Sequence, residues 1–575
     1  MLLNRQISFV SLCCLLFLLS PALPSWAQQA KVWNVAEYQA QGDGSTDDTE
    51  AIQSVIRKAQ PGDTVYIPEG KYRISTLGLR SGVHLKADGL LLQNLPDKEE
   101  FTTKKQNSSF PLIRGKDVSD IHLQLNGLSQ NEAIYLTGSK NIHIDDSKFS
   151  GDSTKLRSFA GILLYQCEEV KITNSTIKNF GTSRESAEYY QPGTGIRILE
   201  SKGVTIEKCL ISKNGQNGVF VHSSPDISVH HCTIIDNGMS AIQVAFGSTR
   251  TEIGYYFSHN YMANNAGDAI DINNRGTGSP LDIEALIEHN ESLANGFVGK
   301  ESTPDGSGIA TLINVSGVQL IKNTAAKNNR PAVYLEDCGN IIIDGNEADN
   351  QVEIVKNLQQ VSMINNVFDH ITFIHNVKAG YLCIENNEFR TIYFPNGITL
   401  NKADFLNNSF SNGSFNLNLS GKVNFQGNQI TNLGKTPTFL IASAAKVTLV
   451  NNEISSEKAP GILLKSKAKG VLLQGNVVNA LNYCIQDEGA TGTRLIHNRL
   501  EVLPSSNRYF TIHSKNPKQM YMEENIHLGK DGVTAVWMEG SGLVEIYEEK
   551  ILAGNVSTNE VKIITLNQAK PNDEN

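Results

Sequence analysis

One asparagine recurs at short, nearly regular intervals through the second half of this 575-residue chain, and it limits the fold more than any other feature. The recurring residues are Asn260, Asn290, Asn323, Asn346, Asn366, Asn387, Asn408, Asn428, Asn452, Asn476 and Asn498. From Asn323 onward, successive members lie 20 to 24 residues apart. That period fits one coil of a β-solenoid, which is built from three short strands and three turns. We therefore predict an all-β chain of stacked coils.

Residues of one turn form a column along such a stack, because neighbouring coils lie ~4.8 Å apart. Asparagine amides in a column can hydrogen-bond to the coils on either side. The same column continues toward the N-terminus through Ser147, Ser175, Cys209 and Cys232. The two cysteines are thus expected in adjacent coils, where either a disulfide or two stacked buried thiols is compatible with the spacing.

The composition places the chain in the class of large folded proteins. It is 40% hydrophobic and 19% charged, and a solenoid of this length forms one elongated domain. The formal charge of -9 argues against a nucleic-acid partner. The cysteines show no metal-type spacing, and no metal ligands are assigned. We expect a monomer without a membrane span.

The N-terminus has the pattern of a signal peptide over residues 1–27. Arg5 supplies the charge, Ile7 to Leu19 the apolar core, and Ala27 ends a small-residue cleavage site. The sequence therefore predicts a secreted or periplasmic protein. We expect an N-terminal cap and first strands over 28–80, β-helix coils over 81–503, and closing coils or a C-terminal cap with a tail over 504–575.

A short helix is predicted near Thr46–Ala59. Thr46, Asp47 and Asp48 are residues that start helices, and an apolar stripe follows them at Ala51, Ile52, Val55, Ile56 and Ala59. A solenoid needs its open apolar end covered, and such a helix does this. The pair Asp47 and Asp48 is interpreted as capping rather than catalytic.

The segment from Asn34 to Ile74, followed by coils, resembles the pectate-lyase-like superfamily of right-handed parallel β-helix proteins. That superfamily includes polygalacturonases, polysaccharide lyases, mannuronan epimerases and phage tailspikes. The resemblance implies a right-handed parallel β-helix that handles a polysaccharide or oligosaccharide along an elongated groove. The motifs match in part. Gly267-Asp268-Ala269 keeps one of the paired aspartates of polygalacturonases, and Asn217 to His222 keeps the Gly and His of the epimerase strand.

The coils before Asn323 are longer than the later ones, and their extra residues indicate loops where function is expected. Two loops, Thr182–Pro192 and Asn295–Gly306, precede the same strand of their coils. Strand alternation predicts two outward rows on that face. The first row is Arg197, Phe220, Gln243, Asp271, Ala310 and Tyr334; the second is Tyr165, Leu199, His222, Ala245, Asn273, Leu312 and Glu336.

Three aspartates are the catalytic candidates on this face. Asp268, Asp271 and Asp305 are expected to lie close together, where two carboxylates can act as general acid and base. A separation of ~6.5–9.5 Å would imply inversion. The alternative is that Asp268 and Asp305 cap turns beside glycines. The substrate-binding candidates are Arg197, His222, Gln243, Asn273, Arg275, Tyr189, Tyr190, Tyr334 and Glu336.

Three functional hypotheses remain from these residues and the resemblance. The first is a secreted enzyme that cleaves glycosidic bonds in a polysaccharide by carboxylate chemistry, without a cofactor. The second is a lyase or C5-epimerase that acts on a uronate polysaccharide, for which Ca²⁺ could be held near Asn273 and Asn274. The third is a glycan-binding β-helix without catalysis.

Overall fold

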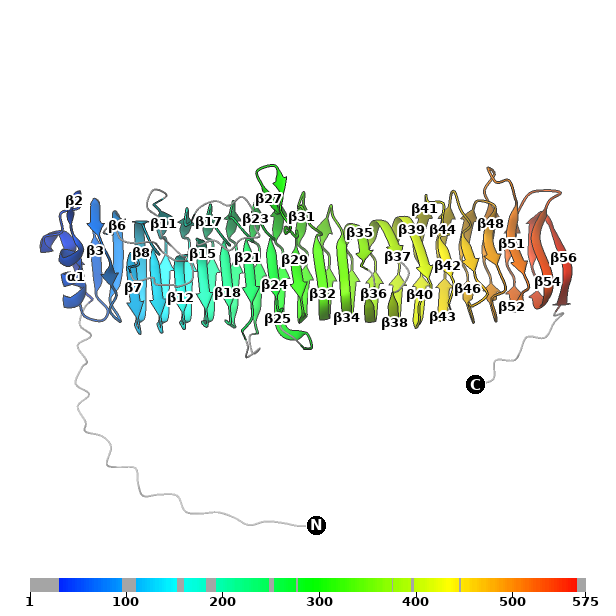
Figure 1. Ribbon diagram of the computed structural model, residues 1–575, viewed down its shortest axis with the longest axis horizontal. Coiled ribbons are helices and arrows are strands. Elements are labelled where there is room, and N and C mark those ends of the chain that lie inside the picture. Colours follow the sequence, from blue (N-terminus) through cyan, green and yellow to red (C-terminus); the bar gives the residue numbers. More distant parts are fainter. Residues whose placement is uncertain are drawn as a thin grey trace, which may run out of the picture.

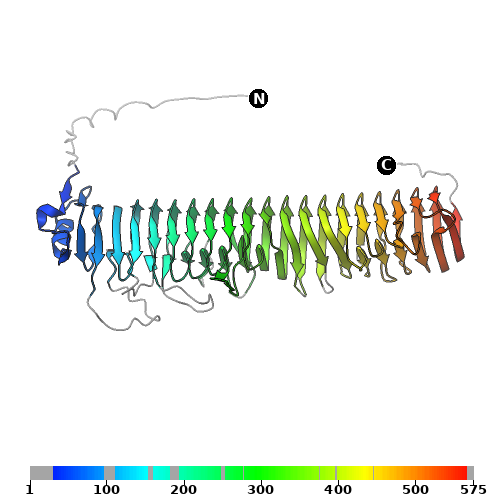
Figure 2. The ribbon, with the colours of Figure 1, turned by 90° about the horizontal axis from the view of Figure 1, so that it is seen from above.

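The computed structural model describes residues 30–95, 110–152, 160–181, 193–247, 253–275, 278–374, 376–394, 398–443 and 446–565. They form a long rod of stacked coils (Figures 1 and 2), in which main-chain pairing links 54 strands into one connected network. Strand pairs in the rod run parallel, so the predicted parallel β-helix is confirmed. The predicted signal peptide lies outside the described residues. Within the described ranges, no helix has the length and apolar character needed to cross a bilayer.

Each coil contributes strands to three sheets that run the length of the rod. The first sheet includes β7 (Ile113–Lys116), β9 (Ile134–Thr137), β12 (Ala160–Tyr165), β15 (Thr194–Leu199), β18 (Val219–His222), β21 (Ile242–Ala245), β24 (Ile270–Asn273) and β29 (Ala310–Ile313). The second includes β10 (Lys140–Asp145), β13 (Glu168–Thr173), β16 (Lys202–Glu207), β19 (Ile227–His230), β22 (Tyr255–Ser258), β25 (Leu281–Glu288) and β30 (Val315–Ile321). The third includes β11 (Lys148–Gly151), β14 (Thr176–Lys178), β17 (Leu210–Ser212), β20 (Thr233–Ile235), β23 (Tyr261–Ala263), β26 (Glu291–Leu293) and β31 (Thr324–Ala326). Beyond these coils some strands are longer and pair with two sheets, such as β32 (Val333–Asp344), β34 (Val352–Ile364) and β54 (Thr534–Tyr547), and the rod ends with β55 (Lys550–Ala553) and β56 (Asn555–Thr565).

The N-terminal end of the rod is covered as predicted. Helix α1 (Thr49–Lys58) buries Ile52, Val55 and Ile56 against the first coils. The helix begins three residues later than predicted, because Asp43–Asp47 forms strand β2 and pairs with β4 (Lys71–Ile74). Asp48 accepts hydrogen bonds from the amides of Gln41 and Gly42, at 2.6 and 3.1 Å. This carboxylate therefore fixes the chain that leads into the helix.

The asparagine column is a hydrogen-bonded ladder that is buried along the corner between the second and third sheets. Each side-chain oxygen accepts from the main-chain N–H and the side-chain amide one coil earlier, as Asn387 does from Asn366 at 2.8 and 2.9 Å. Each side-chain amide also donates to a main-chain carbonyl in the preceding coil, as Asn366 does to Ile343 at 2.8 Å. The ladder continues beyond the predicted members to Asn525 and Glu549.

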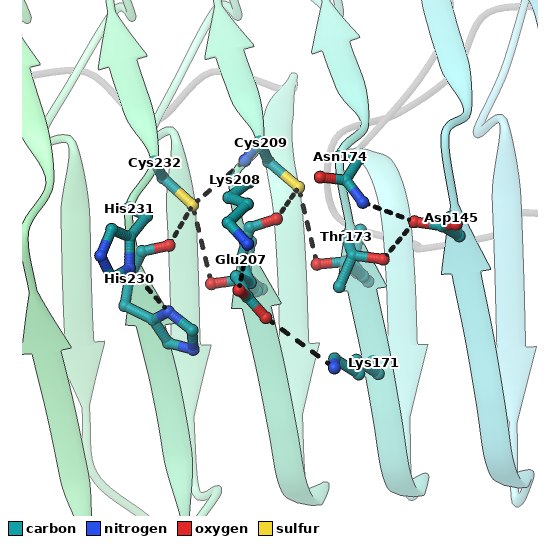
Figure 3. Close-up of polar contacts among 12 residues, drawn as sticks. Asp145, Lys171, Thr173, Asn174, Glu207, Lys208, Cys209, His230, His231 and Cys232 are labelled. Atoms are coloured by element: carbon teal, nitrogen blue, oxygen red, sulfur yellow. Dashed lines mark hydrogen bonds and ion pairs between the residues drawn. The ribbon is translucent and has the colours of Figure 1, made fainter.

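Cys209 and Cys232 are separate thiols within this column (Figure 3). The amide of Cys209 donates to the sulfur of Cys232 at 3.5 Å, so sulfur takes the acceptor role that asparagine oxygen has in later coils. Each thiol donates to a carbonyl two residues upstream, Glu207 or His230, at 3.3 Å. The thiol interpretation is confirmed, and the disulfide alternative is wrong.

A second asparagine ladder, not predicted, runs along the corner where the third sheet ends. Its members are Asn214, Asn237, Asn265, Asn295 and Asn328. Each lies five residues after a member of the first ladder. Asn295 begins one of the long loops, and its main-chain N–H and side-chain amide both donate to Asn328, at 2.9 and 3.0 Å. This ladder therefore fixes the starting point of the loop beside the candidate site.

Candidate active site

The candidate site lies on the outer face of the first sheet, from β15 to β32. Arg197, Phe220, Gln243 and Asp271 follow one another in register on adjacent strands, as predicted. The next member was predicted wrongly. Asp271 is paired with Thr311 rather than Ala310, because the amides of Ile309 and Ala310 both donate to the carbonyl of Ala332.

That bulge adds one residue at the start of β29. As a result Ala310 and Leu312, which the sequence placed in the two outward rows, are fully buried in the core. Thr311 and Ile313 occupy the outward positions instead. From β32 onward the predicted alignment holds again, because Thr311 pairs with Tyr334.

A chain of side-chain amides leads to Asp271. The amide of Ser240 donates to the side-chain oxygen of Asn217 at 3.0 Å. Because a main-chain N–H can only donate, Asn217 must present its NH₂ group to the oxygen of Gln243, at 2.8 Å. Gln243 in turn donates its own NH₂ to Oδ2 of Asp271, at 2.8 Å. The main chain thereby fixes the orientation of both amides and makes Oδ2 an acceptor.

The second oxygen of this carboxyl group has a different environment. Oδ1 of Asp271 is buried and has no hydrogen-bond partner among the described residues. A carboxyl oxygen left without a donor is a poor place for negative charge and a suitable place for a proton. The neutral form of Asp271 would therefore carry its hydrogen on Oδ1.

Asp268 is held by the end of the following loop. Its Oδ1 accepts from the amides of Gly306 and Ser307, at 3.1 and 2.6 Å, and from the hydroxyl of Thr311, at 3.2 Å. The hydroxyls of Ser307 and Thr311 are also hydrogen-bonded to each other, at 2.7 Å. These donors favour the charged form of Asp268.

The three aspartates influence one another. Burial, together with the charges of Asp268 and Asp305, raises the pKa of Asp271 to about 8, although the hydrogen bond from Gln243 opposes the rise. Burial also raises the pKa of Asp268, against the opposing effect of the Ser307 and Gly306 amides. Asp305 lies in the same loop and is half-buried. At neutral pH, Asp271 is therefore mainly protonated.

Arg197 and Phe220 form a platform on the N-terminal side of this acidic centre. The guanidinium of Arg197 lies 4.5 Å from the centre of the Phe220 ring, and the ring of His222 lies 6.5 Å from that ring. His222 is two coils from Asn273 in its row, too far for direct contact with Asp271. A cation stacked on an aromatic ring presents a flat surface with a positive edge.

On the C-terminal side, the predicted binding residues partly engage one another. The hydroxyl of Tyr334 donates to Glu336 at 2.8 Å, and Glu336 also pairs with Lys356. Arg275 and Glu336 line a shared cavity of about 710 Å³ at the edge of the first sheet. Asn273 lies in the row beside Asp271, and its Oδ1 is buried without a partner among the described residues. Tyr189 and Tyr190 lie outside the described residues.

Thr194, Asn217, Ser240 and Ser307 were not among the predicted site residues, because they precede the aligned strands. A polar residue followed by Gly or Ala stands at the start of each strand of the first sheet here, as Thr194, Asn217, Ser240, Asp268 and Ser307. Three links join this row, from Asn217 to Ser240, Ser240 to Asp268 and Asp268 to Ser307. The repeated pair of a polar residue followed by Gly or Ala was the signal in the sequence that could have identified these site residues.

Oδ1 of Asp268 is poorly suited to bind calcium. Ca²⁺ takes about six to eight oxygen ligands, whereas Oδ1 of Asp268 is already engaged by three hydrogen-bond donors. Within the described ranges, no group of three or more His, Cys, Asp or Glu residues could hold a metal ion. We therefore derive no chemistry from a metal at this site.

The structure is thus a parallel β-helix with a buried acidic centre on its first sheet. Residues 32–271 match the family model described as Rhamnogalacturonase A/epimerase, pectate lyase-like. The matched segment includes the N-terminal cap and ends at Asp271. The resemblance to the pectate-lyase-like superfamily is confirmed by this match.

Individual relatives are distant or match only locally. The pre-neck appendage protein of Bacillus phage B103 is 23% identical over 248 residues, which cover 40% of this chain and 26% of that protein. A mannuronan C5-epimerase of Azotobacter vinelandii is 42% identical over 69 residues, covering 10% of this chain and 5% of the epimerase. The chain thus spans far less than two thirds of these relatives. The Yersinia enterocolitica family 28 exopolygalacturonase structure aligns with 87% of this chain and 79% of its own, at 14% identity and a TM-score of 0.33.

Proposed function

We propose that this protein cleaves glycosidic bonds of a polysaccharide in the groove over the first sheet, with Asp271 as general acid. The observation that carries the proposal is a buried carboxyl group whose pKa is raised to about 8, so that it retains its proton at neutral pH. The family match supports a polysaccharide as the substrate class. Residues 1–27 are expected to direct export, and export would bring the protein, which we expect to be a monomer, into contact with such polymers.

The proposed step uses the two aspartates in different roles. Asp271 would donate the proton on Oδ1 to the glycosidic oxygen as the bond to the anomeric carbon breaks. Asp268, as a carboxylate, would take a proton from the water whose oxygen forms the new bond to that carbon. Gln243 and Asn217 would hold the proton on the reactive oxygen of Asp271. Arg197 and Phe220 would bind sugar units three and two coils away.

Single substitutions of the two aspartates test this proposal. Asp271→Asn and Asp268→Asn preserve shape but remove the acid and the base, so turnover on a panel of plant, algal and host polysaccharides should fall by about 10²–10⁴-fold. Binding of the same polysaccharide should persist. Asp226→Asn is the matched control, because Asp226 is half-exposed and pairs with Lys202 away from the groove. Full turnover in Asp271→Asn would refute the proposed acid.

A lyase or C5-epimerase acting on a uronate polysaccharide is the second candidate. It is favoured by the local 42% identity to a mannuronan C5-epimerase and by the positive charge of Arg197 on the outer face. A lyase would release products with an unsaturated uronate that absorbs in the near ultraviolet. An epimerase would change the uronate composition without shortening the chain. Hydrolysis gives new reducing ends without that absorbance, so one incubation with alginate or polygalacturonate separates the three reactions.

Glycan binding without turnover is the third candidate. The three hydrogen bonds to Asp268 favour it, because they also suit a carboxylate that only holds the loop in place. In that case the double variant Asp268→Asn, Asp271→Asn would lose thermal stability with little effect on glycan affinity. Wild-type affinity without product after prolonged incubation would support this candidate.

A further inference from the structure

A second groove lies outside the candidate active site, along the corner at which the third sheet ends. Its volume is about 730 Å³, and we call it the turn groove. Its floor is formed by Asn179, Lys213, Asp236, Asn264 and Ala294 from five successive coils, and its wall by Phe297 and Val298. The wall belongs to the hairpin of β27 (Phe297–Val298) and β28 (Glu301–Ser302), which projects from the rod in Figure 1.

The floor residues form a regular row. Each one directly follows a strand of the third sheet, and these strands are paired in register from β14 to β26. All five adopt the left-handed conformation, with φ between 52° and 61°. Their side chains are therefore repeated at the coil spacing, and four steps of ~4.8 Å span about 19 Å. The turn groove is long and narrow, with its axis along the rod.

Among the polar floor residues, Asn179 donates to Ser150 at 3.1 Å, and the other three are not engaged by the protein. Lys213, Asp236 and Asn264 are exposed, and their side chains form no hydrogen bond or ion pair with any residue in the described ranges. By contrast, Asn365, a left-handed residue beside the first ladder, donates to Asp344 at 3.1 Å. An ammonium, a carboxylate and an amide thus remain available to a ligand.

The end of the turn groove under the hairpin is apolar. Ala294 occupies a left-handed position, which residues other than glycine rarely adopt. Its small side chain leaves room beneath Phe297, which is half-buried and lines the cavity. A flat aromatic face beside free polar groups is the combination typical of sites for hydroxyl-rich ligands.

We propose that the turn groove binds an extended oligosaccharide as a second glycan site. A sugar unit advances a glycan chain by about as much as a coil advances the rod, ~4.8 Å, so successive units would meet equivalent floor residues. Phe297 would stack on one unit, and Lys213, Asp236 and Asn264 would bind hydroxyls of the others. This site does not depend on the catalytic role proposed for Asp271.

A peptide fits the turn groove less well. Peptides that add to sheets need an open edge of main-chain donors and acceptors, whereas β17, β20 and β23 are each paired on both sides. A nucleic acid is disfavoured by the net charge of -9 and by Asp236 in the floor. The groove therefore favours a glycan of low charge density.

Affinity electrophoresis of the full-length protein, in gels containing polygalacturonate, alginate, xylan or dextran, tests the proposal. We expect retardation of the wild type in at least one gel and a loss of about tenfold in affinity for Phe297→Ala. Asn264→Arg, which fills the floor without changing the hairpin, should have the same effect. The matched control Asn386→Ala changes an exposed left-handed asparagine elsewhere on the rod and should bind as the wild type does.

Melting temperatures would establish that each variant is folded. Absence of wild-type retardation in all four gels would overturn the proposal, as would unchanged affinity of both folded groove variants. The same electrophoresis is repeated with the Asp271→Asn variant, so that its result does not depend on the proposed catalytic role of Asp271. Loss of affinity on adding Phe297→Ala there would support the turn groove even if Asp271 has no catalytic role.

Discussion

Replacing Asn366 by alanine tests whether the first asparagine ladder stabilises the rod. The substitution removes the acceptor of the Asn346 main-chain N–H, at 2.9 Å, and the donor to the carbonyl of Ile343, at 2.8 Å. The Asn346 N–H would remain buried without a partner, whereas the Ile343 carbonyl keeps its place in the strand pairing of β32 with β34. The side-chain amide of Asn346 also loses a bond but still donates to Leu320. At about 1–3 kcal/mol for one orphaned buried group, the free energy of unfolding should fall by about 1–3 kcal/mol.

Two further variants isolate the ladder from other effects. Asn365→Gly changes the exposed neighbour, whose left-handed conformation glycine adopts without strain, and should cost less than about 1 kcal/mol. Asn366→Ser should recover part of the loss, because Ser175 accepts from the amide of Ser147 at 3.1 Å in the same column. The expected order of stability is wild type, Asn365→Gly, Asn366→Ser and Asn366→Ala.

Urea unfolding followed by circular dichroism gives the overall change, and hydrogen exchange of the Asn346 amide gives the local one. Solenoid coils contact mainly their neighbours, so the local measurement does not depend on whether the whole rod unfolds in one step. A loss below 1 kcal/mol for Asn366→Ala, with no faster exchange at Asn346, would refute the reasoning.

Three other predictions follow from the site and the cysteines. Burial raises the pKa of Asp271 from 3.8 to about 8, so between these values the native state binds a proton that the unfolded state does not. The contribution of this carboxyl group to stability is therefore present below pH 4 and is lost as the pH rises toward 8. Asp271→Asn should match the wild type near pH 4 and have a higher melting temperature at pH 9, and equal pH dependence of the two proteins would contradict this. Gln243→Leu removes a hydrogen bond that lowers the pKa of Asp271 and should move the alkaline limb of the pH–rate profile upward, with unchanged limbs counting against the amide chain. Six cysteines are free thiols: Cys167, Cys209, Cys232, Cys338, Cys383 and Cys484. Each should react with N-ethylmaleimide after denaturation without reductant. Protection of Cys209 and Cys232, detected by mass spectrometry, would show a disulfide instead.

The architecture could be predicted because its signal is repeated. Asn323, Asn346 and Asn366 report the same turn, so loops of other lengths do not obscure the period. The second ladder carried an equally simple signal, a fixed offset of five residues from the first, as in Asn290 and Asn295. It was missed because long loops follow it directly and disguise the repeat.

The candidate site was less predictable, because its geometry depends on local departures from the repeat. Alignment placed Gln243 beside Asp271 correctly, since the strands there are regular. It failed at Ala310, where two amides share the carbonyl of Ala332 and shift the register by one residue. No residue type marks such a bulge. The contact between Thr311 and Asp268 therefore required three-dimensional coordinates.

The first ladder has a direction, and Glu549 ends it. The oxygen of every asparagine accepts from the preceding coil, and its main-chain N–H and side-chain amide donate to the asparagine of the following coil, so the column needs an acceptor at its far end. Glu549 supplies one, accepting from the amide and the side chain of Asn525 at 3.3 and 2.8 Å, while its other oxygen lies 2.5 Å from His527. A carboxylate has no hydrogen to hand on. The column is therefore chemically terminated, and another rod stacked against this end would find no side-chain amide with which to continue it.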